Sequence, residues 1–467
     1  MDRYDDNYLF TDPRLVPDLL QETDLGSLRP VDRQWRTLWF ELKAPDSLSG
    51  TYPMTFSFFD TQDRLMGQIQ IDIEVIPQSL PKQKLIHTEW FHTDCLANYY
   101  DVETFSEEHW TLIRNFMEGA VRCGVNMILT PIFTPALDTA IGGQRRTTQL
   151  LGIKKESSTY HFDFSLLERW IDLALKVGME YFEMAHFFTQ WGAEHAPKIM
   201  VEEGGEVKQL FGWETDATSD AYHNFLNQLI PELKAFLTKR NLLEKTYFHI
   251  SDEPHDGQLE SYLASKNVVK DLLKDCHVID ALSSVEFYRQ GVVEKPIPAV
   301  DHIEPFIEED IEGLWTYYCC SQAQEVSNRF MAMPSARNRI LGVLLYLYDI
   351  EGFLHWGFNF YNSQYSLYPI NPYVTTDAEG AFQSGDAFLV YPGQDGHPMD
   401  SIRSRVFVEA LQDLRALQKL EDLAGREEVE KLIYEGVDQT IDFKHYPKEP
   451  DYILCLRDKV NRRIGAQ

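Results

Sequence analysis

The sequence is poor in cysteine, and its cysteines follow no pattern of a disulfide framework or a metal site. Six are present among 467 residues: Cys95, Cys123, Cys276, Cys319, Cys320 and Cys455. None are spaced as C-x-x-C, the arrangement typical of zinc ligands and redox pairs. We therefore expect free, buried thiols in a reducing compartment, and we expect no metal and no other cofactor.

The sequence also lacks a long apolar run and an export signal. No segment approaches the roughly 18 consecutive apolar residues that a membrane-spanning helix needs. Residues 1–10, "MDRYDDNYLF", lack the basic and apolar regions of a signal peptide. These absences predict a cytoplasmic protein without a membrane partner.

Basic residues are scarce relative to acidic ones. The chain has 43 Lys and Arg against 73 Asp and Glu, which gives a net charge of −30. A negative field of this size repels phosphate backbones and anionic lipids. Nucleic acid and membrane surfaces are therefore excluded as expected partners.

Aromatic residues, in contrast, are abundant. The 9 Trp, 23 Tyr and 28 Phe make up 13% of the chain. Core packing explains any single one of them. Exposed aromatic rings also stack on the C–H faces of sugars, so the composition allows a carbohydrate ligand.

The first 80 residues predict a small β-sandwich-like domain. Residues 35–42, 52–59 and 67–76 have the composition of strands, and turn-rich segments separate them. In the last of these, apolar residues alternate with polar ones, which is typical of a half-buried strand. Residues 77–84 contain two prolines and predict a linker.

From residue 81 to about residue 430, strands alternate with helical segments. Eight strands are expected, at 84–91, 125–131, 179–186, 245–251, 277–282, 299–303, 313–319 and 352–358. This alternation predicts an α/β fold with a (β/α)8 TIM-type barrel. The alternative is an open doubly wound sheet, disfavoured because no G-x-G-x-x-G motif or P-loop follows any strand. Residues 431–467 are expected to form a C-terminal extension packed on the barrel.

An adjacent pair of acids, Asp252 and Glu253, follows the fourth expected strand in "FHISDEPHDGQ" (248–258). Catalytic groups of such barrels lie at the carboxyl ends of the strands. Two neighbouring carboxylates repel each other, which raises the pKa of one of them and keeps it protonated. The simpler interpretation is a solvated loop pair that caps the helix from Asp256.

Other strand ends supply further acids and aromatic residues to the same expected mouth. Lys and Arg are nearly absent there, which argues against a phosphorylated substrate. The residues are Glu89, Trp90, His92, Asp94, Thr130, Pro131, Glu183, His186, Trp191, Trp315, Tyr317, Tyr318, Trp356, Asn359, Tyr361 and Tyr365. The stretch "HTEWFHTD" (87–94) could also be a set of metal ligands, but we favour a polar lining.

Four motifs together resemble glycoside hydrolase family 123 and the wider bacterial group that shares its C-terminal domain of formerly unknown function. These are "HISDEP", "GLWTYYCC", "RILGVLLYLYDIEGFLHWGFNFYN" and "LVYPGQDGHPMDSIRSRVFVEALQDLRALQ", which lie within residues 240–425. The resemblance implies a retaining exo-β-N-acetylhexosaminidase, N-acetylgalactosaminidase-like, that uses substrate-assisted catalysis. Its substrate would be a glycoside or oligosaccharide with an N-acetylated sugar.

The resemblance also implies roles for individual residues. Glu253 would be the general acid/base, and Asp252 would orient the 2-acetamido group of the substrate. The sugar-binding candidates are Trp315, Tyr317, Tyr318, Trp356, Asn359, Tyr361, His249, Glu89, Trp90 and Glu183.

Two other functions stay open at this point. A conventional retaining glycosidase, with Glu253 as acid/base, would need a glutamate near the end of the seventh strand. That strand offers none, and Glu304 and Glu351 fall on neighbouring elements, so this mechanism ranks second. A barrel that binds carbohydrate without cleaving it is the second alternative.

Overall fold

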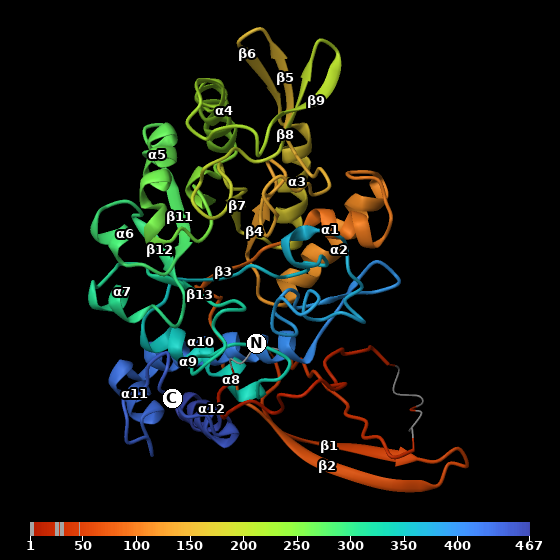
Figure 1. Cartoon of the computed structure of the whole chain (residues 1–467). Helices are drawn as coiled ribbons and strands as arrows, with labels where there is room; N and C mark the ends of the chain where they lie inside the picture. Colours follow the sequence, from red (N-terminus) through yellow and green to blue (C-terminus); the bar gives the residue numbers. More distant parts are fainter. Residues whose placement is uncertain (1–3, 24–27, 29–31, 46) are drawn as a thin grey trace.

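A parallel eight-stranded sheet forms the centre of the computed structural model, which describes residues 4–23, 28, 32–45 and 47–467 (Figure 1). The strand order is β12-β11-β10-β7-β4-β3-β14-β13. A parallel bridge between Ala299 and Tyr317 joins the two ends of this order and closes the barrel. The strands are β3 (Ile86–Glu89), β4 (Met127–Thr130), β7 (Tyr181–Met184), β10 (Thr246–Phe248), β11 (His277–Leu282), β12 (Lys295–Pro298), β13 (Trp315–Tyr317) and β14 (Gly352–His355). The predicted TIM-type barrel is therefore confirmed.

Helices surround the barrel, and their ends follow local sequence signals. Ser106 accepts a hydrogen bond from the His109 amide and caps α2, while Gly178, at φ 112°, ends α3. The helices up to the fifth strand are α1 (Thr93–Tyr99), α2 (Glu107–Arg122), α3 (Ser165–Val177), α4 (Asp220–Lys239) and α5 (Leu259–Val269). Those that follow are α6 (Glu286–Arg289), α7 (Glu304–Glu308), α8 (Ser335–Arg339), α9 (Leu341–Leu347), α10 (Ile402–Ala424), α11 (Arg426–Ile433) and α12 (Pro450–Gly465). In the part of the chain that is described, no helix combines the length and apolarity of a membrane span.

The sixth barrel strand lies earlier than predicted. We expected residues 299–303, but β12 is Lys295–Pro298, in parallel register with β11. Its sequence, "KPIP", contains two prolines, which usually interrupt strands. Because of these prolines, the sequence pattern does not indicate the strand, whose position depends on its pairing with β11.

No pattern in the sequence predicts the four-stranded sheet that lies above the barrel. It is formed by β5 (Gly152–Glu156), β6 (Thr159–Asp163), β8 (Ile199–Glu203) and β9 (Glu206–Phe211), in the order β6-β5-β8-β9. β5 and β6 belong to the long βα loop that follows β4, and β8 and β9 belong to the one that follows β7. The two loops together form this additional sheet. Figure 1 shows this sheet at the top of the molecule. A smaller pair, β15 (Tyr391–Pro392) and β16 (Pro398–Met399), lies before α10.

The N-terminal region has fewer strands than expected. A single hairpin, β1 (Gly50–Phe59) and β2 (Leu65–Val75), pairs in antiparallel register. Residues 35–42, all of them described, form no strand, so the prediction for this segment was wrong. The segment carries the right residue types, but no sheet edge pairs with its backbone.

The C-terminal helices pack beside the barrel. Helix α10 contacts α8, α9, α11 and α12, and α11 also contacts α12. Ile453, Leu456 and Val460 on α12 are buried in this contact. The segment after residue 430 is thus joined to the barrel through α10.

Candidate active site

The two adjacent acids stand directly beyond β10, at the carboxyl end of the barrel. β10 pairs with β7 on one side and β11 on the other. Asp252 and Glu253 are partly buried. The pKa of Asp252 is raised well above its ordinary value, mainly by burial and secondly by the negative charge of Glu253. Burial also raises the pKa of Glu253, whereas a hydrogen bond from Tyr317 opposes this. The pair therefore holds a proton more readily than two exposed acids would.

The backbone at the pair is strained. Glu253 has a φ of 43°, in the left-handed region that a glutamate seldom adopts. The amide of Trp191 donates a hydrogen bond of 3.0 Å to the carbonyl of Asp252 and holds the turn in place. Strain of this kind concentrates at functional sites.

Tyr317, at the end of β13, is the direct partner of Glu253. Its hydroxyl donates to Glu253 Oε1 across 2.5 Å. The charges of Asp386 and Asp301 also act on Glu253 and raise its pKa. The indole of the half-buried Trp356 donates to Asp386 Oδ2 at 2.8 Å.

His249, on the same segment as the pair, lies between two buried carboxylates, those of Glu183 and Asp280. His249 Nε2 lies 2.6 Å from Glu183 Oε1, and Nδ1 lies 3.2 Å from Asp280 Oδ1. Burial alone would lower the pKa of His249, but the hydrogen bonds with Asp280 and Glu183 outweigh it and raise the pKa to about 10. The buried imidazolium is attracted to both carboxylates and also to Asp252.

Glu183 organises the centre of the barrel mouth. Besides His249, it accepts hydrogen bonds from the Thr88 hydroxyl at 2.5 Å and the Trp90 indole at 2.7 Å. Trp90 also stands edge-on to His249, with ring centroids 6.3 Å apart. Of the predicted sugar-binding residues, Tyr317 contacts Glu253 directly, and His249 and Glu183 act on Asp252 through their charges. Trp90 and Trp356 bind Glu183 and Asp386, two acids whose charges act on the pair.

Other predicted residues are engaged elsewhere. Trp315 is buried inside the barrel against Tyr247, with ring centroids 5.3 Å apart. Glu89 binds Arg329 in a buried bidentate ion pair, with Nη1–Oε1 at 2.6 Å and Nη2–Oε2 at 2.9 Å. Tyr318 packs against Phe353.

Asn359 and Tyr361 also bind protein groups. The amide of Asn359 exchanges hydrogen bonds with the backbone of His92, and the Tyr361 hydroxyl donates to the Val390 carbonyl at 2.8 Å. The described contacts do not bring these five residues, Trp315, Glu89, Tyr318, Asn359 and Tyr361, to the acid pair. Their described contacts lie within the barrel and its loops.

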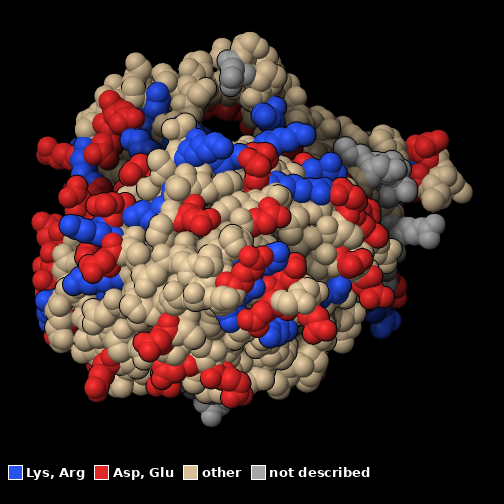
Figure 2. Space-filling model, turned by 90° about the horizontal axis from the view of Figure 1, so that it is seen from above, with Lys and Arg blue, Asp and Glu red and all other residues tan. Residues whose placement is uncertain are grey.

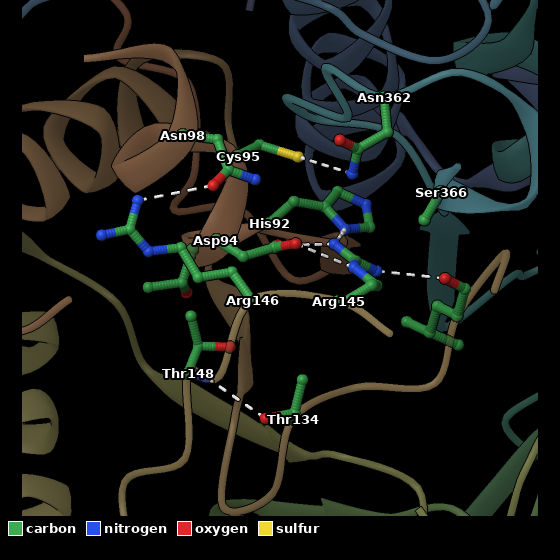
Figure 3. A network of polar contacts seen from close by, with 12 residues as sticks. His92, Asp94, Cys95, Asn98, Thr134, Arg145, Arg146, Thr148, Asn362 and Ser366 are labelled. Carbon is green, nitrogen blue, oxygen red and sulfur yellow. Dashed lines mark hydrogen bonds and ion pairs between the residues drawn. The ribbon is translucent and has the colours of Figure 1, made fainter. Parts of the chain in front are cut away.

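The side chains of residues 87–94 that were considered as alternative metal ligands contact other protein groups. His92 is buried, its Nε2 lies 2.8 Å from the Trp356 carbonyl, and its Nδ1 lies 3.1 Å from Arg145 Nη2. Asp94 forms a buried ion pair with Arg145, at 2.5 Å (Figure 3). Burial and the Arg145 charge lower the pKa of His92 to about 3. This network holds the loop that carries Arg145 against the end of β3.

A second group of possible metal ligands is His186, His249 and Asp280. Both nitrogens of His249 lie within hydrogen-bond distance of carboxylates, and the raised pKa of the ring favours its doubly protonated form, which has no lone pair for a cation. His186 stacks on it, with centroids 4.2 Å apart. The geometry favours an ionic network over a metal centre.

Three acids at the mouth were missed by the sequence analysis. Asp280 could have been found, because it is a charged residue inside the apolar strand "HVIDAL" (277–282). Asp301 follows β12, whose position was misjudged. Asp386 lies about 30 residues after β14 in a segment without a motif, so no local signal was available.

Comparisons with known proteins agree with the fold. Residues 90–420 match the model of the glycoside hydrolase 123 catalytic domain. The fold is similar to that of a family 123 glycoside hydrolase from Clostridium perfringens, studied for glycolipid glycan hydrolysis. That match has a TM-score of 0.65 and 16% identity, and it covers 90% of this chain and 75% of that one.

A more remote similarity is to a β-galactosidase from Bacillus circulans sp. alkalophilus. It has a TM-score of 0.38 and 11% identity, covering 73% of this chain and 57% of the other, and it supports no argument. A search of curated proteins found no match.

Proposed function

Because the chain belongs to glycoside hydrolase family 123, we propose that it is a retaining exo-β-N-acetylhexosaminidase, N-acetylgalactosaminidase-like, that uses substrate-assisted catalysis. The observation that carries the proposal is the adjacent, partly buried pair Asp252 and Glu253, which has raised pKa values at the end of β10. The substrate is a glycoside with a terminal N-acetylated sugar. The Clostridium perfringens relative, which is described as acting on glycolipid glycans, supports an oligosaccharide substrate.

In the proposed reaction the substrate supplies the nucleophile. Glu253 gives its proton to the glycosidic oxygen as the bond from that oxygen to the anomeric carbon breaks. The acetamido carbonyl oxygen bonds to the anomeric carbon, while Asp252 accepts a hydrogen bond from the amide N–H and offsets the developing positive charge. Ionised Glu253 then takes a proton from water, which attacks the anomeric carbon and restores the amide. Two inversions retain the configuration.

The contacts of the pair suggest where its proton lies. In the free protein the Tyr317 hydroxyl stabilises Glu253 as a carboxylate, so the proton resides on Asp252. A bound acetamido group would donate its N–H to Asp252 and stabilise the charged form of that residue. The proton then moves to Glu253, where the leaving oxygen needs it.

The conventional two-carboxylate mechanism lacks its expected partners. Glu351 precedes β14, at the opposite end of that strand from the mouth, and binds Lys295 at 2.7 Å. Glu304 begins α7 and pairs with Lys444 at 3.2 Å. Asp301 and Asp386 remain as possible second carboxylates, so the experiment below includes a test for them.

The decisive experiment compares aryl β-glycosides with and without a 2-acetamido group. We expect hydrolysis of the acetamido set only, inhibition by a thiazoline analogue of the sugar, and faster turnover of the galacto than the gluco isomer. Glu253→Gln should lower kcat by about 10²–10⁴-fold, the usual contribution of a general acid. The matched control is Asp256→Asn, at an exposed carboxylate three residues away.

Two outcomes would reject the mechanism. One is wild-type turnover by Glu253→Gln on the acetamido substrate. The other is a covalent adduct with a 2-fluoro sugar, which would establish a protein nucleophile. Binding of N-acetylated sugars without hydrolysis of any glycoside would instead favour the carbohydrate-binding alternative.

A further inference from the structure

The hairpin of β1 and β2 has one apolar face and one polar face. Residues paired across an antiparallel ribbon lie on the same face. The register places Tyr52 opposite Ile73, Met54 opposite Ile71 and Phe56 opposite Ile69. We call these six residues and Phe58 the apolar ribbon face. The reverse face carries Thr51, Pro53, Thr55, Ser57, Gln68, Gln70, Asp72 and Glu74.

The apolar ribbon face is only partly covered, because Met54, Phe56 and Ile73 are half-buried while its other four residues are exposed. Ile69 is 56% exposed, Ile71 is 42% exposed and Phe58 is 37% exposed. Figure 1 shows the hairpin extending away from the barrel as an arm. One ring does reach it, since Phe40 lies 4.4 Å from Phe56, centroid to centroid. A two-stranded ribbon of this kind is marginal alone and needs a covering layer.

The uncovered surface is large enough for a stable dimer. Residues 35–42 lie beside the ribbon through Phe40 and add Trp35, 97% exposed, together with Trp39 and Leu42. Scaled by their exposed fractions, Tyr52, Phe58, Ile69, Ile71, Trp35, Trp39, Phe40 and Leu42 amount to about four fully exposed side chains, or roughly 600–1,000 Å² at about 150–250 Å² each. The largest apolar patch of a typical monomer is about 300–600 Å². A standard interface buries about 800 Å² per partner.

We propose that the apolar ribbon face is covered by the same face of a second copy of this chain. Two ribbons would stack about a two-fold axis into a small sandwich, with sheets about 10 Å apart. Such an interface requires a self-complementary surface, and a flat apolar ribbon provides one. The apolar ribbon face carries no charge, whereas Asp72 and Glu74 point from the reverse face toward solvent. Two chains of net charge −30 can thus approach there without burying like charges.

Sedimentation velocity of the full chain over a range of concentrations tests this proposal. We expect a dimer for the wild type. The double substitution Ile69→Asp and Ile71→Asp should raise the dimer dissociation constant at least about tenfold, because it would bury unpaired carboxylates. The matched control, Gln68→Asp and Gln70→Asp, adds the same charges to the reverse face and should leave the dimer intact.

Folding is checked separately through the thermal unfolding of the barrel, which the arm substitutions should leave unchanged. A monomeric wild type would overturn the proposal, as would a dimer that the apolar-face substitutions do not weaken. The chain is also sedimented with phosphatidylcholine vesicles. Co-sedimentation lost in the Ile69→Asp and Ile71→Asp variant would make a lipid surface the occupant and reject the second copy.

Discussion

Asp252 and Glu253 differ in their surroundings although they are neighbours in the sequence. Glu253 has a left-handed backbone and a tyrosine donor, whereas Asp252 faces the His249 imidazolium at a longer range. Both carboxyl groups are harder to ionise in the folded protein than in water. A raised pKa is useful to an enzyme that needs one protonated acid at neutral pH. It also lowers the stability of the folded state, because the same acids ionise more easily in the unfolded chain.

Asp252→Asn should therefore stabilise the protein at neutral pH. The pKa of Asp252 in the folded state lies above its value in the unfolded state. The contribution of Asp252 to the free energy of unfolding is therefore fully present below the unfolded-state pKa, and it is lost as the pH rises through the folded-state pKa. Replacing the carboxyl group by an amide removes the cost of keeping this acid protonated in the folded state, and should raise Tm by about 2–4 °C at pH 7.5, which corresponds to ~1 kcal/mol in a large chain. At pH 4 the difference should vanish.

Thermal unfolding of both proteins at pH 4, 6 and 7.5 provides the measurement. Asp256→Asn is the control and should change Tm at none of these values, because Asp256 is exposed. Equal Tm for wild type and Asp252→Asn across the range would show that the carboxylate pair stores no electrostatic strain.

At the scale of single residues, the sequence indicated the acid pair but not the buried ionic network of Glu183, His249 and Asp280. The pair lies in a local motif, and the end of a barrel strand gives it a function. Glu183, His249 and Asp280 meet only because β7, β10 and β11 are neighbours in the sheet. Trp315 lies in a motif that resembles the family, and Glu89 lies at the end of a barrel strand. Trp315 nevertheless faces the barrel interior, and Glu89 binds the buried Arg329. Strand orientation decides such cases, and a sequence pattern does not specify it.

Among the elements, the loop around Arg145 depends on one buried ion pair. Arg145 binds both oxygens of Asp94, at 2.9 and 2.5 Å, and also donates to the Leu137 carbonyl at 3.0 Å. Figure 3 shows the guanidinium between Asp94 and His92. Removing one member of such a pair leaves the other charge buried without a partner.

Arg145→Met should therefore destabilise the protein by about 3–5 kcal/mol, as measured by urea unfolding. The double variant Arg145→Met and Asp94→Leu should recover part of this loss, since no isolated carboxylate remains. Arg169→Met breaks the exposed pair with Glu107 and is the control, with an expected cost of about 0–1 kcal/mol. A double variant less stable than the sum of both single variants would contradict the explanation.

Elements were easier to predict by type than by extent. Seven of the eight expected strand ranges contain the observed strand, because apolar runs bounded by turns identify buried strands. The exception, β12, has two prolines. The sheet of β5, β6, β8 and β9 was missed because its strands are short and exposed on one side, so they resemble loops.

For the whole molecule, net charge is the property that composition determines without a fold. Acidic and basic side chains are interspersed over the face in Figure 2, and the total still reaches −30. Self-repulsion of this excess charge opposes the compact state, and salt screens it with a Debye length of about 10 Å at 0.1 M. The barrel and its ionic centre, in contrast, are buried and much less accessible to screening.

We therefore expect Tm to rise by about 2–4 °C between 20 and 300 mM NaCl at pH 7.5, the change that ~1 kcal/mol produces in a chain of this size. Differential scanning calorimetry gives the measurement, and an equal osmolality of glucose provides an uncharged comparison. At pH 5, nearer the isoelectric point of about 4.8, the same salt step should have a smaller effect because the net charge has fallen. A Tm that falls with salt at pH 7.5 would mean that surface ion pairs contribute more to stability than the charge excess removes, since screening weakens those pairs as well.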